Sequence, residues 1–183
     1  VAFLLLSLLS TGGMTTWAQD DSRLSFGVIS DIHFGSNVGE GSMVKVPQAL
    51  KHLTSHGKLD ALVMVGDLTN GGQASQYEKL VQVFTDEQTF TNPVGELLFL
   101  MGNHDNYDGN GRRNYQNGLK VFNGGEPYPF HAYHVIKGYP FITVSMFDGS
   151  NSDIHNPSNG MPGQAYFCVR TCASALDMLF RLG

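Results

Sequence analysis

Metal-binding side chains occur in three short motifs, each of which follows an apolar stretch of the chain. The motifs are DIH at 31–33, GDLTN at 66–70 and GNHD at 102–105. Their leading ligand candidates are evenly spaced, since 67 − 31 and 103 − 67 are both 36. Carboxylate, amide and imidazole groups are ligands for divalent metal ions. If they converge, they form a dinuclear centre of the kind that hydrolyses phosphate esters.

Strands and helices alternate around these motifs. The apolar runs 24–30 (LSFGVIS), 61–65 (ALVMV) and 97–101 (LLFLM) are typical of buried strands. Helices are predicted over 47–56, with Pro47 in the first turn and Gly57 at the end, and over 76–84. The order β-α-β-α-β favours a parallel sheet, whose ligands lie at the carboxyl ends of its strands. All three motifs occupy that position.

The residue types suggest which side chain binds which metal ion. Asp31 and His33 are two residues apart, so in an extended backbone both side chains point the same way and hold one ion. Asp67 follows a glycine that lets the backbone pass close to a metal, and its carboxylate can bridge two ions. Asn103 offers a neutral oxygen to the second ion.

The two residues after Asn103 suggest proton transfer. His104 is expected to point towards the leaving-group oxygen, where it can donate a proton. Asp105 is expected to orient that imidazole through a hydrogen bond. Asn103, His104 and Arg112 are also candidates to bind the substrate phosphate, although an exposed loop charge is the plainer interpretation of Arg112.

The remainder of the chain is less regular. Residues 106–130 are rich in Gly, Asn and Tyr and are predicted to form a long loop. A hairpin is expected from 132–136 and 141–146, and an amphipathic helix from 173–182. His52 and His56 are four apart and favour a solvated helix face over a metal pair. Cys168 and Cys172 form no disulfide framework and receive no role.

Composition and the N-terminus limit the possible partners. A length of 183 residues suits one domain, and a net charge of −5 with a pI of about 5.7 gives no footprint for nucleic acid. Residues 1–9 are apolar and small residues lead to Ala18. This indicates a signal peptide over 1–18 that lacks its charged n-region. The run is too short to span a bilayer, so we expect an exported protein, periplasmic or secreted, without a transmembrane segment after cleavage.

Together the three motifs resemble those of the calcineurin-like metallophosphoesterases, whose pattern is D-x-H, G-D, G-N-H-D/E, a lone His and then G-H-x-H. The resemblance implies an α/β sandwich of two mixed β-sheets flanked by helices, with a partial domain over 24–167 and an uncertain tail over 168–183. It implies two Fe, Mn or Zn ions and a phosphoester substrate, small or macromolecular. By this resemblance Asp31 and His33 bind the first ion and Asp67 bridges, while Asn103 binds the second ion and His104 donates the proton.

The last two blocks of the family pattern are not found in this sequence. The only histidines after Asp105 are His131, His134 and His155, and none lies in a G-H-x-H block. The second ion would then keep Asp67 and Asn103 alone. We therefore expect a C-terminally incomplete fold. Two alternatives stay open, namely a phosphoester hydrolase and an inactive truncated fragment that binds one metal weakly.

Overall fold

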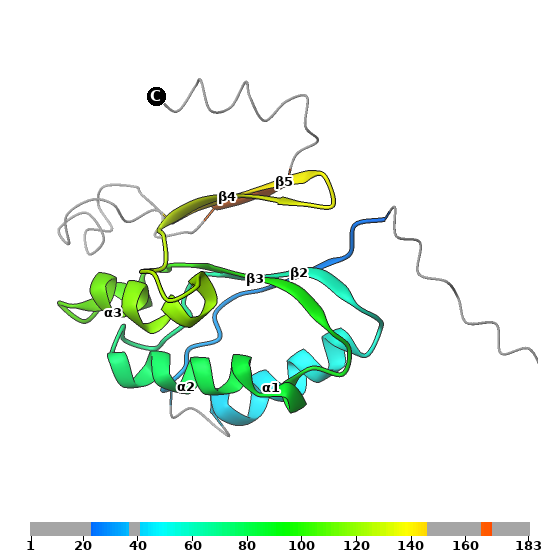
Figure 1. Cartoon of the computed structure of the whole chain (residues 1–183). Coiled ribbons are helices and arrows are strands. Elements are labelled where there is room, and N and C mark those ends of the chain that lie inside the picture. The colour runs from blue at the N-terminus through cyan, green and yellow to red at the C-terminus, as the bar shows by residue number, and fades with distance from the viewer. Residues whose placement is uncertain (1–22, 37–40, 146–165, 170–183) are drawn as a thin grey trace, which may run out of the picture.

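The structure is a computed structural model that describes residues 23–36, 41–145 and 166–169 (Figure 1). Its first sheet contains β1 (Phe26–Ile29), β2 (Leu59–Val65) and β3 (Val94–Leu100), which are parallel and lie in the order β1-β2-β3. Val63 is paired with Val28 on one side and with Leu98 on the other. The three predicted strands are thus confirmed, and their carboxyl ends meet at one edge of the sheet.

Two helices cover one face of this sheet. The crossover helices α1 (Ser42–Thr54) and α2 (Ala74–Thr85) both lie below it in Figure 1. The alternation of side chains along β2 explains the layering. Leu62 and Met64 belong to the core cluster that contains Leu50 and Leu80 of these helices, whereas the neighbouring β2 residues face the opposite layer.

A second sheet packs on the other face of the first. It contains β4 (His131–Ile136), β5 (Tyr139–Val144) and β6 (Tyr166–Val169), all antiparallel in that order. Val63 and Leu98 of the first sheet share a buried cluster with Ile136 and Phe141 of the second. The α/β sandwich predicted from the sequence is confirmed. Over the described strands, the first sheet is entirely parallel and the second is entirely antiparallel.

Helix α1 begins earlier than the sequence suggested. It starts at Ser42, so Pro47 lies inside the helix and not in its first turn. The Ser42 hydroxyl donates a hydrogen bond to the His33 carbonyl oxygen at 2.6 Å, which ties the first residue of the helix to the DIH motif. This tertiary contact stabilises the first turn of α1, which the position of Pro47 in the sequence does not predict.

The segment 106–130 is not the long irregular loop that was expected. After the short turn η2 (His104–Asn106) it forms α3 (Gly111–Gly118) and η3 (Lys120–Asn123). The sequence of α3 is GRRNYQNG, which has no apolar stripe to predict a helix. Its fully buried Tyr115 donates a hydrogen bond to the Phe99 carbonyl oxygen at 2.9 Å, so contact with β3 holds it in place.

The predicted hairpin is confirmed. Lys137 and Gly138 both have positive φ, 50° and 79°, as a two-residue turn between antiparallel strands requires. Several predicted features lie outside the described residues, namely the leader over 1–18, His155, Cys172 and the helix expected over 173–182. Among the residues that are described, no helix has the length and apolar character needed to cross a bilayer.

Candidate metal centre

Backbone hydrogen bonds hold the first two motif loops side by side at the carboxyl edge of the sheet. The Asp31 amide donates to the Gly66 carbonyl oxygen at 3.2 Å, and the His33 amide donates to the Asp67 carbonyl oxygen at 3.0 Å. Phe34 then forms an isolated parallel bridge with Thr69. The 31–33 and 66–70 motifs are therefore kept in register beyond the ends of their strands.

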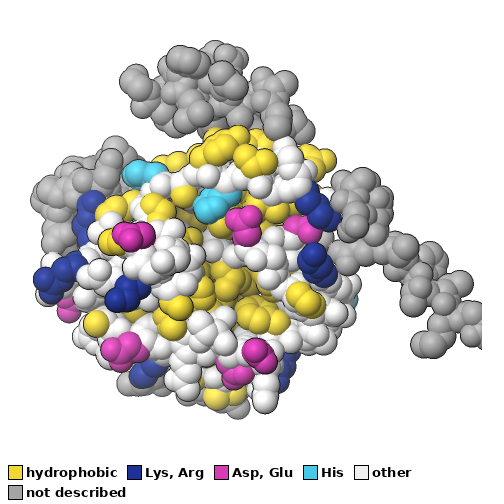
Figure 2. All heavy atoms as spheres, viewed as in Figure 1, with side chains coloured by type: hydrophobic (Ala, Val, Ile, Leu, Met, Phe, Trp, Pro, Cys, Tyr) yellow, Lys and Arg dark blue, Asp and Glu magenta, His cyan; other side chains and the backbone are white. Residues whose placement is uncertain are grey.

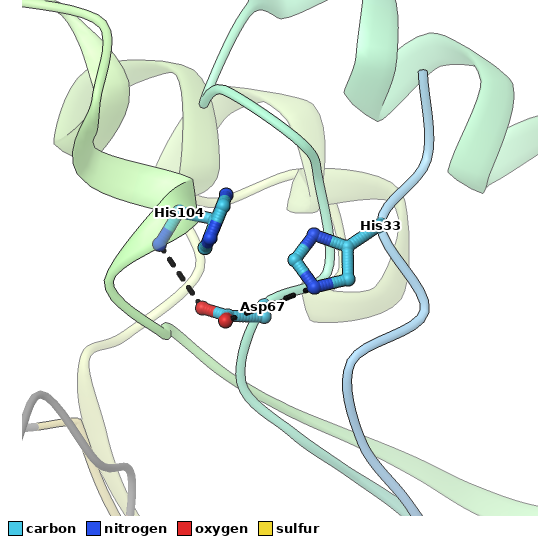
Figure 3. A group of neighbouring side chains, drawn as sticks. All are labelled: His33, Asp67 and His104. Atoms are coloured by element: carbon cyan, nitrogen blue, oxygen red, sulfur yellow. Dashed lines mark hydrogen bonds and ion pairs between the residues drawn. The ribbon is translucent and has the colours of Figure 1, made fainter. Parts of the chain in front are cut away.

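Three side chains from three separate segments converge at this edge. His33, Asp67 and His104 each present a ligand atom, and these atoms lie within 4.8 Å of one another (Figure 3). The His33 Nε2 atom is 3.9 Å from Asp67 Oδ2. The two imidazole rings stand nearly perpendicular, with centroids 4.5 Å apart. His33 and Asp67 were predicted as metal ligands, whereas His104, the third member of this group, was predicted as a proton donor.

The backbone at these positions is left-handed and not extended. Asp31, His33 and Asp67 have φ values of 55°, 43° and 48°. The premise that Asp31 and His33 align through extended geometry was therefore wrong. Left-handed non-glycine residues cost about 1 kcal/mol or more each and occur where surrounding contacts hold them, commonly at functional sites. Here the hydrogen bonds between the loops supply that restraint.

Asp31 nevertheless reaches the cluster from its rim. One of its carboxylate oxygens lies 3.9 Å from His33 Nε2, and its side chain is 67% exposed, against 14% for Asp67. Asp67 thus lies inside the site and Asp31 at its opening.

The position of Asp67 is set by the 102–105 motif. Its Oδ1 atom accepts a hydrogen bond from the His104 amide at 3.0 Å, which leaves Oδ2 directed to His33. A Cβ at Gly102 would collide with the backbone nitrogen and Oδ1 of Asp67. The glycine at 102 therefore lets β3 end directly against this carboxylate.

Asn103 and His104 are oriented by neighbours outside the metal cluster. The Asn103 Nδ2 group donates to the Tyr107 hydroxyl at 3.2 Å. His104 Nδ1 lies 3.1 Å from the Asn70 carbonyl oxygen. Because a carbonyl only accepts, this contact assigns the proton of the neutral ring to Nδ1 and leaves the lone pair on Nε2.

Asp105 has a different place from the one expected. Its buried carboxylate accepts hydrogen bonds from five donors and not from the His104 ring. The donors are the amides of Leu68, Thr69 and Gly102 and the hydroxyls of Thr69 and Tyr77, at 2.8–3.1 Å. The expectation that Asp105 orients His104 was wrong in this respect, because both oxygens are engaged in joining the 66–70 loop to the 102–105 loop. The part played by Tyr77, a core helix residue, had no signal in the sequence.

Burial of Asp105 leads to a pH-dependent prediction. Desolvation raises the pKa of this carboxyl from 3.8 to about 6, although hydrogen bonds from Gly102, Thr69 and Leu68 act in the opposite direction. The folded chain then binds more protons than the unfolded chain between these values. The stability that Asp105 contributes is therefore greatest below about pH 4 and falls as the pH rises to about 6. A ¹³C NMR titration of its carboxyl carbon should have a midpoint near pH 6, and a midpoint below 4 would contradict the prediction.

The other candidate residues have simpler environments. Arg112 is half-buried, with its guanidinium carbon 4.6 Å above the centre of the Phe130 ring, and is not an exposed loop charge. His52 on α1 and His56 in the turn after this helix are both exposed, as expected for solvated side chains. His134 Nδ1 lies 3.4 Å from a Glu96 carboxylate oxygen, on the strands of the two sheets.

Comparison with known protein families agrees with this geometry. The profile of the calcineurin-like phosphoesterases matches residues 24–169, which is most of the chain. The chain belongs to the calcineurin-like phosphoesterase family. Comparison with proteins of curated function gave no match. Membership of this family suggests metal-dependent phosphoester hydrolysis as the reaction class, and the fold it implies is the one observed.

The donor set of this calcineurin-like phosphoesterase suits a metal ion. His33 Nε2 faces carboxylate oxygens of Asp31 and Asp67, each at 3.9 Å, which is too long for a hydrogen bond. Ligands that bind one ion at about 2.0–2.2 Å lie up to about 4.4 Å apart. The 3.9 Å between His33 Nε2 and Asp67 Oδ2 is therefore a separation that two ligands of one cation can have.

Proposed function

We propose that this chain hydrolyses phosphate mono- or diesters at a dinuclear metal centre. The observation that carries the proposal is the convergence of His33, Asp67 and His104 from three loops at the carboxyl edge of the parallel sheet. Family membership supports the same reaction class. Net charge is −5, so an anionic ester needs metal ions or a local basic patch at the site to bind there.

The proposed ligands divide between two ions. Asp31 and His33 would hold the first, Asp67 would bridge, and Asn103 would contribute to the second. Oxygen and nitrogen donors of this kind accept Fe, Mn or Zn. The Asp67 Oδ1 atom is fixed by the His104 amide, so Oδ2, which faces His33, is the oxygen that would bind metal.

The residues around the ions would carry the remaining chemistry. Bound metals would supply Lewis-acid activation of water and charge neutralisation at the phosphoryl oxygens. His104 lies at the same edge and, in its doubly protonated form, would give the Nε2 proton to the leaving-group oxygen, since the Nδ1 proton is held by the Asn70 carbonyl. Arg112 on α3 is proposed to contact the substrate phosphate only if it leaves its position over Phe130.

A second candidate function is binding of a single metal without turnover. It is favoured by one observation: across the described ranges, only one group of three His, Cys, Asp or Glu side chains has metal-binding geometry. Asn103 and Asp67 alone would hold a second ion weakly, because octahedral or five-coordinate binding requires more ligands.

Metal loading and turnover of the full chain distinguish the two functions. We expect p-nitrophenyl phosphate or bis(p-nitrophenyl) phosphate to be hydrolysed in the presence of Mn²⁺ or Zn²⁺. Activity should be lost after dialysis against a chelator and restored by the metal. Calorimetry should then show two bound ions per chain. One weakly bound ion without hydrolysis of either ester would instead support the second function.

A further inference from the structure

Tyr107 lies beside the proposed proton donor. It follows the turn η2, and its amide donates to the His104 carbonyl oxygen at 3.2 Å. The rings of Tyr107 and His104 are 4.3 Å apart between centroids and tilted by 42°. The Tyr107 side chain is 47% exposed, so one side of its ring contacts His104 and the remainder faces solvent. Its position is therefore at the opening of the candidate metal centre.

The hydroxyl of Tyr107 joins two of the candidate site residues. It accepts a hydrogen bond from Asn103 Nδ2 at 3.2 Å and lies 3.4 Å from His104 Nε2. On the other side of the imidazole, Nδ1 is 3.1 Å from the Asn70 carbonyl oxygen. These donors and acceptors agree with one another. The Asn103 side-chain amide donates to the Tyr107 hydroxyl oxygen, and the Tyr107 phenol proton is directed to the lone pair of His104 Nε2. The His104 Nδ1–H group is directed to the Asn70 carbonyl.

We propose that Tyr107 is a positioning residue for His104: its hydroxyl holds the Nε2 edge of the imidazole at the opening of the site until the leaving-group oxygen of the ester takes its place beside Nε2. The inference rests on the proposed function. A hydroxyl both donates and accepts, so Tyr107 can hold the ring whether Nε2 is bare or protonated. The 3.4 Å separation is long, as such contacts commonly are before a substrate binds.

This role has a specific chemical consequence. A proton donor matters most when the departing oxygen is basic, and least when the departing anion is already stable. Loss of the Tyr107 hydroxyl should therefore affect phenyl phosphate, which has a poor leaving group, more than p-nitrophenyl phosphate. Both esters carry the same phosphoryl group, so metal binding and phosphate recognition cancel in the ratio of their kcat/KM values.

The first arm of the test is independent of turnover. In ¹⁵N-labelled full chain without metal, histidine NMR at a pH where the rings are neutral reports which nitrogen of His104 holds the proton. Tyr107→Phe should raise the share of the Nε2–H tautomer, because the ring loses the phenol that donates to Nε2. The matched control is Tyr133→Phe, which removes the hydroxyl of a tyrosine that is 54% exposed on β4. An unchanged His104 spectrum in Tyr107→Phe overturns the proposal.

The second arm uses the two esters with the metal-loaded full chain. Tyr107→Phe should lower kcat/KM about tenfold for phenyl phosphate, the effect expected for one hydrogen bond, and less than about twofold for p-nitrophenyl phosphate. Equal losses on both esters, or none, would overturn the positioning role. If the wild-type chain hydrolyses neither ester, the proposed function fails by itself, and the NMR arm alone decides whether Tyr107 positions His104.

Discussion

Asp67→Ala is expected to abolish metal binding and to lower the rate of phosphoester hydrolysis by about a hundredfold to a thousandfold, since a bound metal supplies several kcal/mol of transition-state stabilisation. Asp67 is the member of the cluster with contacts on both sides. Its Oδ1 accepts from the His104 amide at 3.0 Å, and its Oδ2 lies 3.9 Å from His33 Nε2. No other carboxylate of the described chain belongs to the metal-binding group.

A paired variant separates charge from shape at this position. Asp67→Asn keeps an oxygen for the His104 amide but removes the negative charge, so it should fold normally and still lose metal affinity. The matched control is Asp86→Asn, an exposed acidic residue whose Oδ1 accepts from the Gln88 amide at 2.9 Å beyond α2. Calorimetry with Zn²⁺ or Mn²⁺ measures the affinity. Wild-type affinity in Asp67→Asn would show that this carboxylate is not a ligand.

Asp105→Ala should be among the most destabilising single changes in the chain. Five donors converge on this carboxylate, from Leu68, Thr69, Tyr77 and Gly102, and alanine would leave them buried without an acceptor. Each unsatisfied buried group costs about 1–3 kcal/mol, and these costs do not simply add. We expect a loss of about 3–5 kcal/mol in the free energy of unfolding, measured by urea denaturation.

Asp105→Asn tests the same buried hydrogen-bonding site with less change in side-chain volume. The amide nitrogen of asparagine would face backbone N–H donors, so this variant should also lose stability by more than about 2 kcal/mol. The control is Asp108→Asn, because the Asp108 side chain accepts only one exposed hydrogen bond among those described, from the Asn110 amide at 2.8 Å. That variant should change stability by less than about 1 kcal/mol. If Asp105→Asn kept wild-type stability and lost only activity, the earlier idea that Asp105 orients His104 would regain support.

Local sequence patterns were sufficient for the scaffold. The continuous apolar run at 61–65 predicts a strand buried on both faces, and β2 indeed lies between the helices and the second sheet. The apolar stripe of Tyr77, Leu80, Val81 and Phe84 predicts α2. In the structure Tyr77, Leu80 and Phe84 are buried and Val81 is half-buried. Strand periodicity also placed the three motifs at one edge, since parallel strands end together. These features depend on residues close in sequence, which is why they could be predicted.

Contacts between distant residues decided the remainder. The polar helix α3 exists because Tyr115 reaches the carbonyl of Phe99 on β3, and a polar eight-residue segment does not encode that contact by its own period. The left-handed backbone at Asp31 and His33 is held by hydrogen bonds to the 66–70 loop.

The sequence by itself predicted that His33 and Asp67 lie together at the carboxyl edge of the parallel sheet, and the structure places both in one candidate metal-binding group with His104. Only the tertiary structure decided that Asp105 is a buried hydrogen-bond hub and that Tyr107 contacts His104. The physical reason is that residue type and spacing fix a side chain's chemistry and its approximate place. Most of the partners of Asp105 come from distant segments, with Leu68 at a separation of 37 residues and Tyr77 at 28. Such partners become known only when the loops are packed together.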